Sequence, residues 1–240
     1  MATEPPSVPA APQSADGREV SALVMMLWFG VLQLAGLVAG WAASLYLFGG
    51  AFSSFTAFPQ VRNATSVQTA AALGPAIRSM TLVLPVTGAV EIIALAILAI
   101  GFWGLRRVDR TFSVPSILTI VMVVGGGLAV AGGVGFFGSV SNIITQAPTA
   151  SASLSSAEFS SAVASLFIAF FMLAIGGLLT LIGFIGGELL GLWRAGSRYN
   201  ETLLKLGAIF TIIPFLNLAA PVLIIVGASQ ARSRLRAGTA

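Results

Sequence analysis

The sequence predicts an all-α, polytopic transmembrane bundle of about five hydrophobic helices, the fifth broken by proline. Of the 240 residues, 57% are hydrophobic and only 8% are charged, whereas soluble domains carry about 25% charged residues. The charges are also clustered, so that residues 20–61 and 111–157 contain none. Each of these gaps is long enough for the roughly 20 apolar residues that a helix needs to cross a bilayer.

The residue types that are missing limit the chemistry of the chain. Histidine and cysteine are both absent, which removes the commonest general base, the commonest metal ligand and any disulfide framework. We therefore expect no enzyme, no catalytic residue, no cofactor and no metal site. The twelve basic residues are dispersed among the ends of the apolar segments, so a nucleic-acid partner is not expected either.

The chain divides into a tail, a membrane domain and a second tail. Residues 1–19 are rich in Pro, Ala and Ser and lack an apolar run, so we expect them to be disordered and not to form a signal peptide. Residues 20–230 form the predicted transmembrane helical domain. Residues 231–240 are a short basic C-terminal tail.

The first predicted helix covers residues 21–47. Gly36 and Gly40 are four residues apart, a spacing that lets another helix approach closely. Glycine is also common in membrane helices without a packing role, so both interpretations stay open. The polar stretch that follows contains a glycosylation sequon at Asn63, which matters only if this loop faces outward in a cell with the machinery.

The second predicted helix covers residues 80–104 and contains a carboxylate near its middle. Pro85 is expected to kink the helix because it lacks an N–H. Glu91 shares a face with Thr87 and with small residues, which predicts that its side chain points into the bundle. The carboxyl is then either a proton or cation relay, or a neutral acid hydrogen-bonded to Thr87 or to another helix.

The third and fourth predicted helices, residues 116–137 and 159–187, are dense in glycine. In lipid, unpaired backbone groups cost several kcal/mol each, so these segments stay helical in spite of their glycines. Small residues four apart are expected to form grooves and ridges for neighbouring helices. The glycines expected in helix contacts are Gly36, Gly40, Gly127, Gly135, Gly183, Gly187 and Gly191.

Aromatic and basic residues at the helix ends are expected to anchor the bundle at the headgroups. Glu188, close to this level, is expected to pair with Arg194 or with the arginines that end the second helix. The predicted anchors are Trp103, Arg106, Arg107, Trp193, Arg194, Arg198 and Tyr199.

The fifth apolar segment, residues 203–229, is interrupted by Pro214, Asn217 and Pro221. Two interpretations are open: one bent crossing, which its length favours, or two half-helices that turn back inside the membrane. A crossing leaves seven basic residues on one side and five on the other, whereas a turn gives ten and two. In both cases the more basic side holds the N-terminus, which is expected to be cytoplasmic.

The last third of the chain resembles a known family. Trp193, Gly196 and the run Arg198-Tyr199-Asn200, together with the Ile-Pro-Phe-Leu-Asn bend that ends at Asn217, are similar to archaeal multi-spanning membrane proteins grouped as domain of unknown function 973. The resemblance implies an archaeal cell-membrane protein. It implies no activity, substrate or catalytic residue.

Two functions are compatible with these features. The first is a structural or accessory membrane subunit whose partners are the lipid bilayer and either further copies of itself or another membrane protein. The alternative is a transporter or channel for a proton, a cation or a small solute, built around Glu91, Thr87 and Asn217, because carboxylates and broken helices inside membranes often mark transport pathways.

Overall fold

The computed structural model describes residues 17–55, 66–146 and 156–238, and every regular element in these ranges is helical. The predicted all-α fold class is confirmed. The sequon at Asn63 and residues 1–16 of the predicted tail lie outside the described ranges. In chain order the elements are α1 (Gly17–Phe55), α2 (Ser66–Arg106), η2 (Arg110–Phe112), α3 (Ser113–Gln146), α4 (Ser156–Gly183), η3 (Phe184–Leu189), α5 (Leu190–Arg198), α6 (Thr202–Phe210), η4 (Leu216–Leu218) and α7 (Ala220–Ala237).

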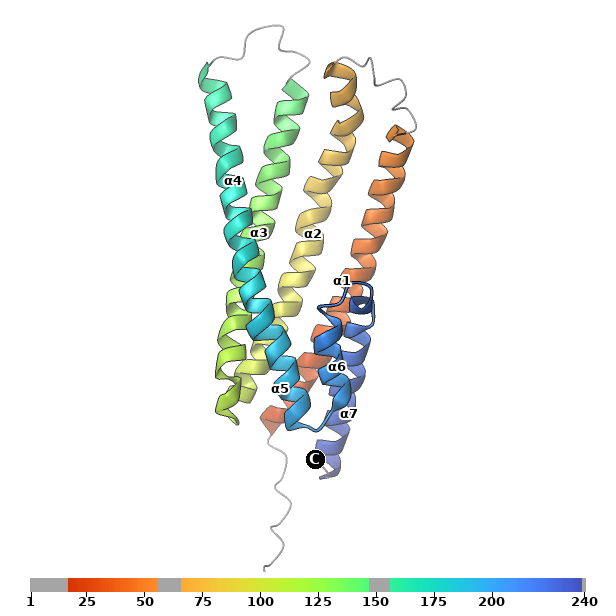
Figure 1. The fold of residues 1–240 in the computed structure, drawn as a ribbon, viewed down its shortest axis with the longest axis vertical. Helices are drawn as coiled ribbons and strands as arrows, with labels where there is room; N and C mark the ends of the chain where they lie inside the picture. The colour runs from red at the N-terminus through yellow and green to blue at the C-terminus, as the bar shows by residue number, and fades with distance from the viewer. Residues whose placement is uncertain (1–16, 56–65, 147–155, 239–240) are drawn as a thin grey trace, which may run out of the picture.

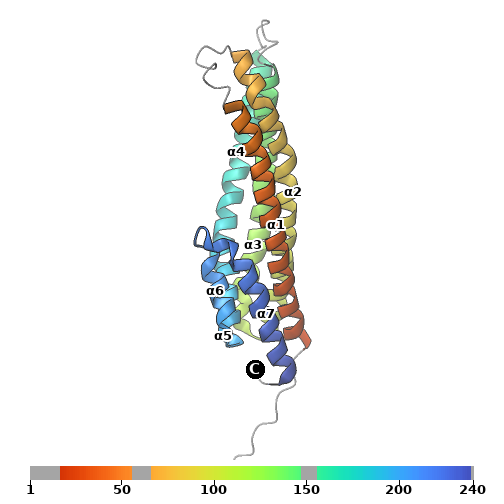
Figure 2. The ribbon, with the colours of Figure 1, turned by 90° about the vertical axis from the view of Figure 1, so that its right-hand side faces the viewer.

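Four helices in the described ranges are long and apolar enough to cross a membrane: Gly17–Leu45, Met80–Arg106, Arg110–Ile143 and Ser160–Arg198. Helices α1 to α4 stand side by side in chain order, with α1 and α4 at the two ends of the row (Figure 1). The shorter helices α5 to α7 lie against one face of the row in its lower half, where α7 packs along α1 (Figures 1 and 2).

The fifth apolar segment does not cross as one helix. Helix α6 ends at Phe210, before Pro214, and Phe215 has a φ of 70° in the turn that follows. Helix α7 then begins with Pro221 in its first turn and runs back along α6 (Figure 2). The expected single bent crossing is therefore wrong, and the alternative of two half-helices describes this segment.

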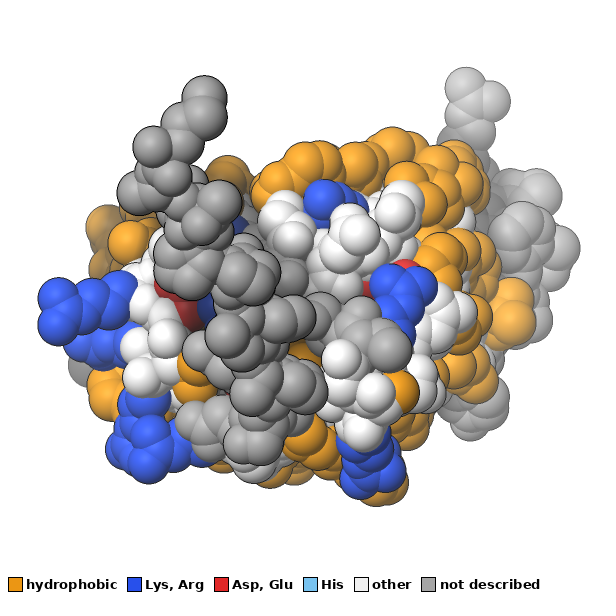
Figure 3. Space-filling view, turned by 90° about the horizontal axis from the view of Figure 1, so that it is seen from below, with side chains coloured by type: hydrophobic (Ala, Val, Ile, Leu, Met, Phe, Trp, Pro, Cys, Tyr) orange, Lys and Arg blue, Asp and Glu red, His pale blue; other side chains and the backbone are white. Residues whose placement is uncertain are grey.

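The C-terminal end of the α6–α7 hairpin lies beside the turn that begins it. The guanidinium of Arg234 is 3.3 Å from the carboxylate of Glu201 and donates a hydrogen bond to the backbone oxygen of Asn200. Both ends of the described chain are consequently at the same end of the bundle (Figure 1). Lysine and arginine side chains are spread around the rim of this end (Figure 3), which we call the basic end.

The buried core is concentrated toward the basic end. Aromatic and aliphatic side chains from α1, α2, η2, α5, α6 and α7 meet there without exposed surface, which is the arrangement expected where several helices close on one another. They include Phe29, Phe102, Phe112, Leu192, Leu204 and Ile224.

Helices α3 and α4 approach most closely at glycines that were not predicted. A Cβ atom added to Gly125 would lie 2.6 Å from the backbone nitrogen of Thr180, and one added to Gly176 would lie 2.7 Å from the carbonyl oxygen of Gly125. By contrast, a Cβ atom on Gly127 would meet nothing within 4 Å. The closest contact of α3 therefore runs through Gly125 and Gly132. Of the predicted groove, Gly135 does face α4, where its Cβ atom would lie 3.3 Å from Ala169 Cβ, whereas the prediction at Gly127 is wrong.

The other predicted glycines differ in their surroundings. Gly183 and Gly187 lie against the backbone of α3, and Gly191 lies against the ring of Phe102, so these three form a contact ridge. Gly36 faces α2, whereas a side chain at Gly40 would be in open space.

Arg198 joins three elements at the basic end. Its guanidinium lies 2.5 Å from Glu19 Oε1 on α1 and 2.9 Å from Asp109 Oδ2 in the turn before η2. The neighbouring Tyr199 is buried, with 4% of its surface exposed, and this burial raises the pKa of its hydroxyl. Tyr199 is therefore a core residue, and the predicted headgroup anchor at this position is wrong.

The remaining predicted anchors lie near the same end. Trp103 and Trp193 are exposed, Arg106 lies over the Trp103 ring at 4.9 Å, and Lys205 lies 5.9 Å from the Trp193 ring. Arg107 is exposed. Exposed tryptophans beside cations are typical of a membrane interface.

Candidate functional site

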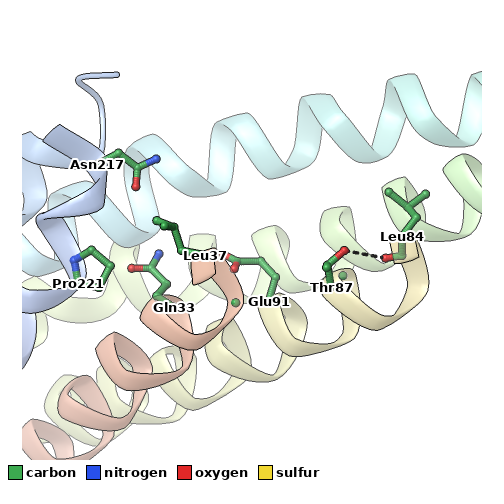
Figure 4. A pocket seen from close by; sticks show the side chains of 9 residues that line it. Gln33, Leu37, Leu84, Thr87, Glu91, Asn217 and Pro221 are labelled. Carbon is green, nitrogen blue, oxygen red and sulfur yellow. Dashed lines mark hydrogen bonds between the residues drawn. The ribbon is translucent and has the colours of Figure 1, made fainter. Parts of the chain in front are cut away.

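A cavity of about 380 Å³ lies where the tip of the α6–α7 hairpin meets α1 and α2 (Figure 4). Amide, hydroxyl and carboxyl groups line it together with leucine, glycine and proline. The lining residues are Gln33, Gly36, Leu37, Leu84, Thr87, Gly88, Glu91, Asn217 and Pro221. The structure thus brings all three predicted polar residues, Glu91, Thr87 and Asn217, around one space.

Glu91 is held inside the bundle by the position of its helix. It lies 15 residues before Arg106, or about 22 Å along the axis at 1.5 Å per residue, a distance shorter than the thickness of a hydrocarbon layer, about 30 Å. Gly36 on α1 leaves room for it, since a Cβ atom there would lie 4.0 Å from Glu91 Oε2. In the described part of the chain, no basic group forms an ion pair with Glu91.

Thr87 does not satisfy the Glu91 carboxyl. Its hydroxyl donates to the backbone oxygen of Val83 at 2.9 Å. It also donates to that of Leu84 at 3.3 Å, again on its own helix (Figure 4). The expected hydrogen bond between Thr87 and Glu91 is therefore not formed. What Thr87 contributes to the cavity is the free acceptor capacity of its oxygen.

The tip of the hairpin closes the cavity on the side opposite α2. Pro214 and Pro221 prevent continuous helical hydrogen bonding in this segment, and the chain turns between them. The turn places the amide of Asn217 on the cavity side, facing Gln33 and Glu91 (Figure 4). A straight or gently bent helix would have carried Asn217 past this point.

The site includes a second carboxyl, Glu188, that sequence analysis placed wrongly. Only 1% of its surface is exposed, and its Oε1 accepts a hydrogen bond of 3.2 Å from Gln33 Nε2. The expected partner, Arg194, instead donates to the backbone oxygen of Thr111. Gln33 also lines the cavity together with Glu91, so Gln33 links the two carboxyls into one polar group.

The chain was compared with known families and structures. It matches the family described as "Protein of unknown function (DUF973)" over residues 21–240. The chain belongs to this family. No curated protein and no solved structure matches it.

In this family member, an irregular turn presents Glu188 to the bundle. Residues Phe184–Leu189 form a π-helix between α4 and α5, and such widened turns are rare and frequent at functional sites. The turn packs against α3, where a Cβ atom on Gly187 would lie 2.6 Å from the backbone nitrogen of Thr119. This close contact holds Glu188 on the inner face.

One sequence signal could have identified Gln33. It is the only amide or charged residue between residues 20 and 52, and a strongly polar side chain is costly in a membrane helix unless it faces protein or water. For Glu188 the sequence context was misleading, because a carboxylate a few residues before Arg194 and Arg198 is also typical of an ion pair at the membrane interface. In chemical terms, the group offers carboxyl and amide oxygens, which bind protons and small cations.

Proposed function

We propose that this protein is a multi-pass cell-membrane transporter that binds a small cation in the Glu91 cavity. The observation that carries the proposal is a carboxyl lining a cavity about 22 Å from the basic end of α2, without a basic partner in the described chain. A charged side chain at the bilayer centre costs about 3 kcal/mol or more. A bound cation would offset that cost.

The size of the cavity supports a small solute. At about 30 Å³ per water molecule, the volume of 380 Å³ corresponds to about a dozen waters. A partly hydrated monovalent ion or a small organic ammonium ion fits this space. The walls offer oxygens from Glu91, Thr87, Asn217 and Gln33 as ligands.

The re-entrant hairpin supports transport in a second way. Broken helices within membranes are tolerated where they line a cavity, and they supply backbone and side-chain groups to ions in transporters. Here the break at Pro214 places Asn217 at the same cavity as Glu91. In this proposal, Asn217 and Glu91 bind the cation and catalyse no reaction, so we propose no enzymatic activity.

The charge distribution supports a cytoplasmic N-terminus. Because the hairpin turns back, ten basic residues belong to the basic end and two to the other end, and cytoplasmic loops carry the excess of Lys and Arg. The ten are Arg18, Arg106, Arg107, Arg110, Arg194, Arg198, Lys205, Arg232, Arg234 and Arg236.

The proposal is tested with purified protein in liposomes. We expect uptake of Na⁺ or methylammonium by the wild type, and a decrease of about tenfold or more in Glu91→Gln, equivalent to about 1.4 kcal/mol of lost cation stabilisation. The matched control is Thr180→Val, which should keep the uptake because this hydroxyl also donates to its own helix and does not line the cavity. Uptake that is the same in Glu91→Gln and in the wild type would refute the cation site.

A structural or accessory role is the second candidate, and the surface of the hairpin favours it. Phe215 at the tip is 86% exposed, and Ile212 and Leu216 beside it are also exposed. Only 17% to 28% of each crossing window is buried within one chain, which leaves apolar surface for lipid, further copies or another membrane protein. Absence of uptake by the wild type, together with a second membrane protein that co-purifies stoichiometrically, would favour this candidate.

A further inference from the structure

The Gln33 amide bonds one carboxyl of the site, Glu188, and lines the cavity together with the other, Glu91. Its nitrogen donates to Glu188 Oε1, while its own oxygen is buried and has no partner among the described residues. Figure 4 shows this oxygen directed toward the Pro221 side of the cavity, with Glu91 on the neighbouring helix. A buried oxygen without a donor is costly unless something occupies the space beside it.

We propose that Glu188 is the proton-binding group of this site, and that the Gln33 amide makes proton binding at Glu188 and cation binding in the cavity oppose each other. The inference rests on the proposed cation site and adds the identity of the exchanged ion. The protein would then exchange a small monovalent cation for a proton.

The chemistry of the amide supplies the coupling. An amide has a donor end and an acceptor end. While Glu188 is ionised, it binds the donor end, and the amide oxygen is available to a cation in the cavity. When Glu188 carries a proton, its O–H donates to the amide oxygen after a half-turn of the Gln33 side chain. The NH₂ end then faces the cavity and disfavours a cation.

The charges of the site balance in this exchange. Besides Glu188 itself, Glu91 on α2 is the ionisable residue of this polar group in the described chain, while α1 contributes neutral Gln33 and α3 neutral Thr119. Two enclosed carboxylates without a cation are unfavourable. One monovalent cation that enters the cavity is therefore matched by one proton that leaves Glu188 for water.

The positions of the two carboxyls fit an exchange between the two ends of the bundle. Glu188 lies ten residues before Arg198, or about 15 Å from the basic end, and thus nearer to it than Glu91 at about 22 Å. Beyond Glu188, the buried side chains of Leu192 and Phe102 close the bundle toward that end. The proton site is enclosed, whereas the cation site lines the cavity.

Proton release on cation binding tests the inference. Na⁺ or methylammonium is added to weakly buffered, detergent-solubilised full-length protein, and bound cation and released protons are measured together. The wild type should release about one proton per cation. In Glu188→Gln, cation binding should persist with at least fivefold less proton release, and Gln33→Leu should also lower the ratio of protons to cations. A ratio is independent of the amount of folded protein.

Infrared spectroscopy of the wild type gives a second readout that needs no variant. Cation addition should remove a carboxylic-acid C=O band, and that band should be absent from Glu188→Gln. Cation binding with equal proton release in the wild type and in Glu188→Gln would overturn the inference and leave the proposed function intact. If the wild type binds neither probe cation, the proposed function fails, and the inference fails with it.

Discussion

At the scale of single residues, Asp109 shows how one side chain can order the basic end. Its Oδ1 accepts hydrogen bonds from the backbone nitrogen of Thr111 at 2.9 Å and from the Thr111 hydroxyl at 2.8 Å, and its Oδ2 contacts Arg198. The bonds from Thr111, followed by the positive charge of Arg198, hold the pKa of the Asp109 carboxyl below its usual value. Asp109 thus caps η2 and ties it to α5.

We expect Asp109→Ala to lower the free energy of unfolding by about 1 kcal/mol at pH 7, the usual value of a capping side chain. The exposed ion pair with Arg198 adds little because solvent screens it. Since the folded-state pKa is lowered, this stabilisation is complete above the ordinary aspartate pKa of about 3.9 and is lost as pH falls through the folded-state pKa. Thermal unfolding in detergent at several pH values measures the difference.

The Asn variant at this position separates capping from charge. Asp109→Asn retains an acceptor oxygen for Thr111, so it should keep part of the stability, and that part should not depend on pH. A difference between the wild type and Asp109→Ala that stays constant down to pH 2 would contradict the assignment of the capping role to the ionised form.

The residues of the candidate site were predictable where helix geometry decides their direction. The small, partly polar neighbours of Glu91 and Thr87 indicated the inner face of α2, and the cavity lies there. Gln33 and Glu188 were missed because the hydrogen bond between them joins two residues that are 155 positions apart in the chain. The pattern of one helix carries no information about such a distant partner.

At the scale of elements, the close contact of α3 and α4 depends on particular glycines. We expect Gly176→Ala to lower the free energy of unfolding by about 1–3 kcal/mol, because its Cβ atom would lie 2.7 Å from the carbonyl oxygen of Gly125, on backbone that cannot yield easily. The adjacent Gly177→Ala is the matched control. A Cβ atom there would meet nothing within 4 Å, so its stability should be unchanged or slightly higher.

Thermal unfolding of both variants in the same detergent gives the comparison. Equal stability of Gly176→Ala and Gly177→Ala would show that the α3–α4 contact does not depend on backbone approach. The sequence contains six glycines between residues 125 and 135. The spacing of four selected Gly135, which faces α4, and Gly127, which does not, but it missed the closest contacts at Gly125 and Gly132. Gly125 and Gly132 are seven apart, the repeat expected for left-handed packing of nearly parallel helices.

The course of the fifth apolar segment is the feature of the fold that sequence patterns predicted least well. Its length suited one crossing, and proline is tolerated in membrane helices. Two backbone conformations decide the actual path: Asn200 with a φ of 49° turns α5 into α6, and Phe215 with a φ of 70° turns α6 toward α7. Asparagine is enriched at positive φ, so the turn at Asn200 has a signal in its residue type, whereas phenylalanine is rarely found there and the turn at Phe215 has none.

At the scale of the whole molecule, the α6–α7 hairpin strengthens the prediction of how the chain is oriented in the membrane. A fifth crossing would divide the twelve basic residues seven to five, whereas the turn at Pro214 divides them ten to two. The ion pair between Arg234 and Glu201 fixes the end of α7 beside the α5–α6 turn. The positive-inside tendency and the packing of α7 therefore favour the same arrangement.

Cysteine labelling tests this arrangement, because the chain contains no cysteine of its own. Single cysteines are introduced at Thr111 in η2, at Ser233 near the end of α7 and at Ile143 near the far end of α3. A membrane-impermeant maleimide should label the Ile143 variant on intact cells, and the Thr111 and Ser233 variants only after permeabilisation. Labelling of Ser233 together with Ile143 on intact cells would mean that the fifth segment crosses. The hairpin tip, and with it Asn217, would then have no reason to lie at the cavity.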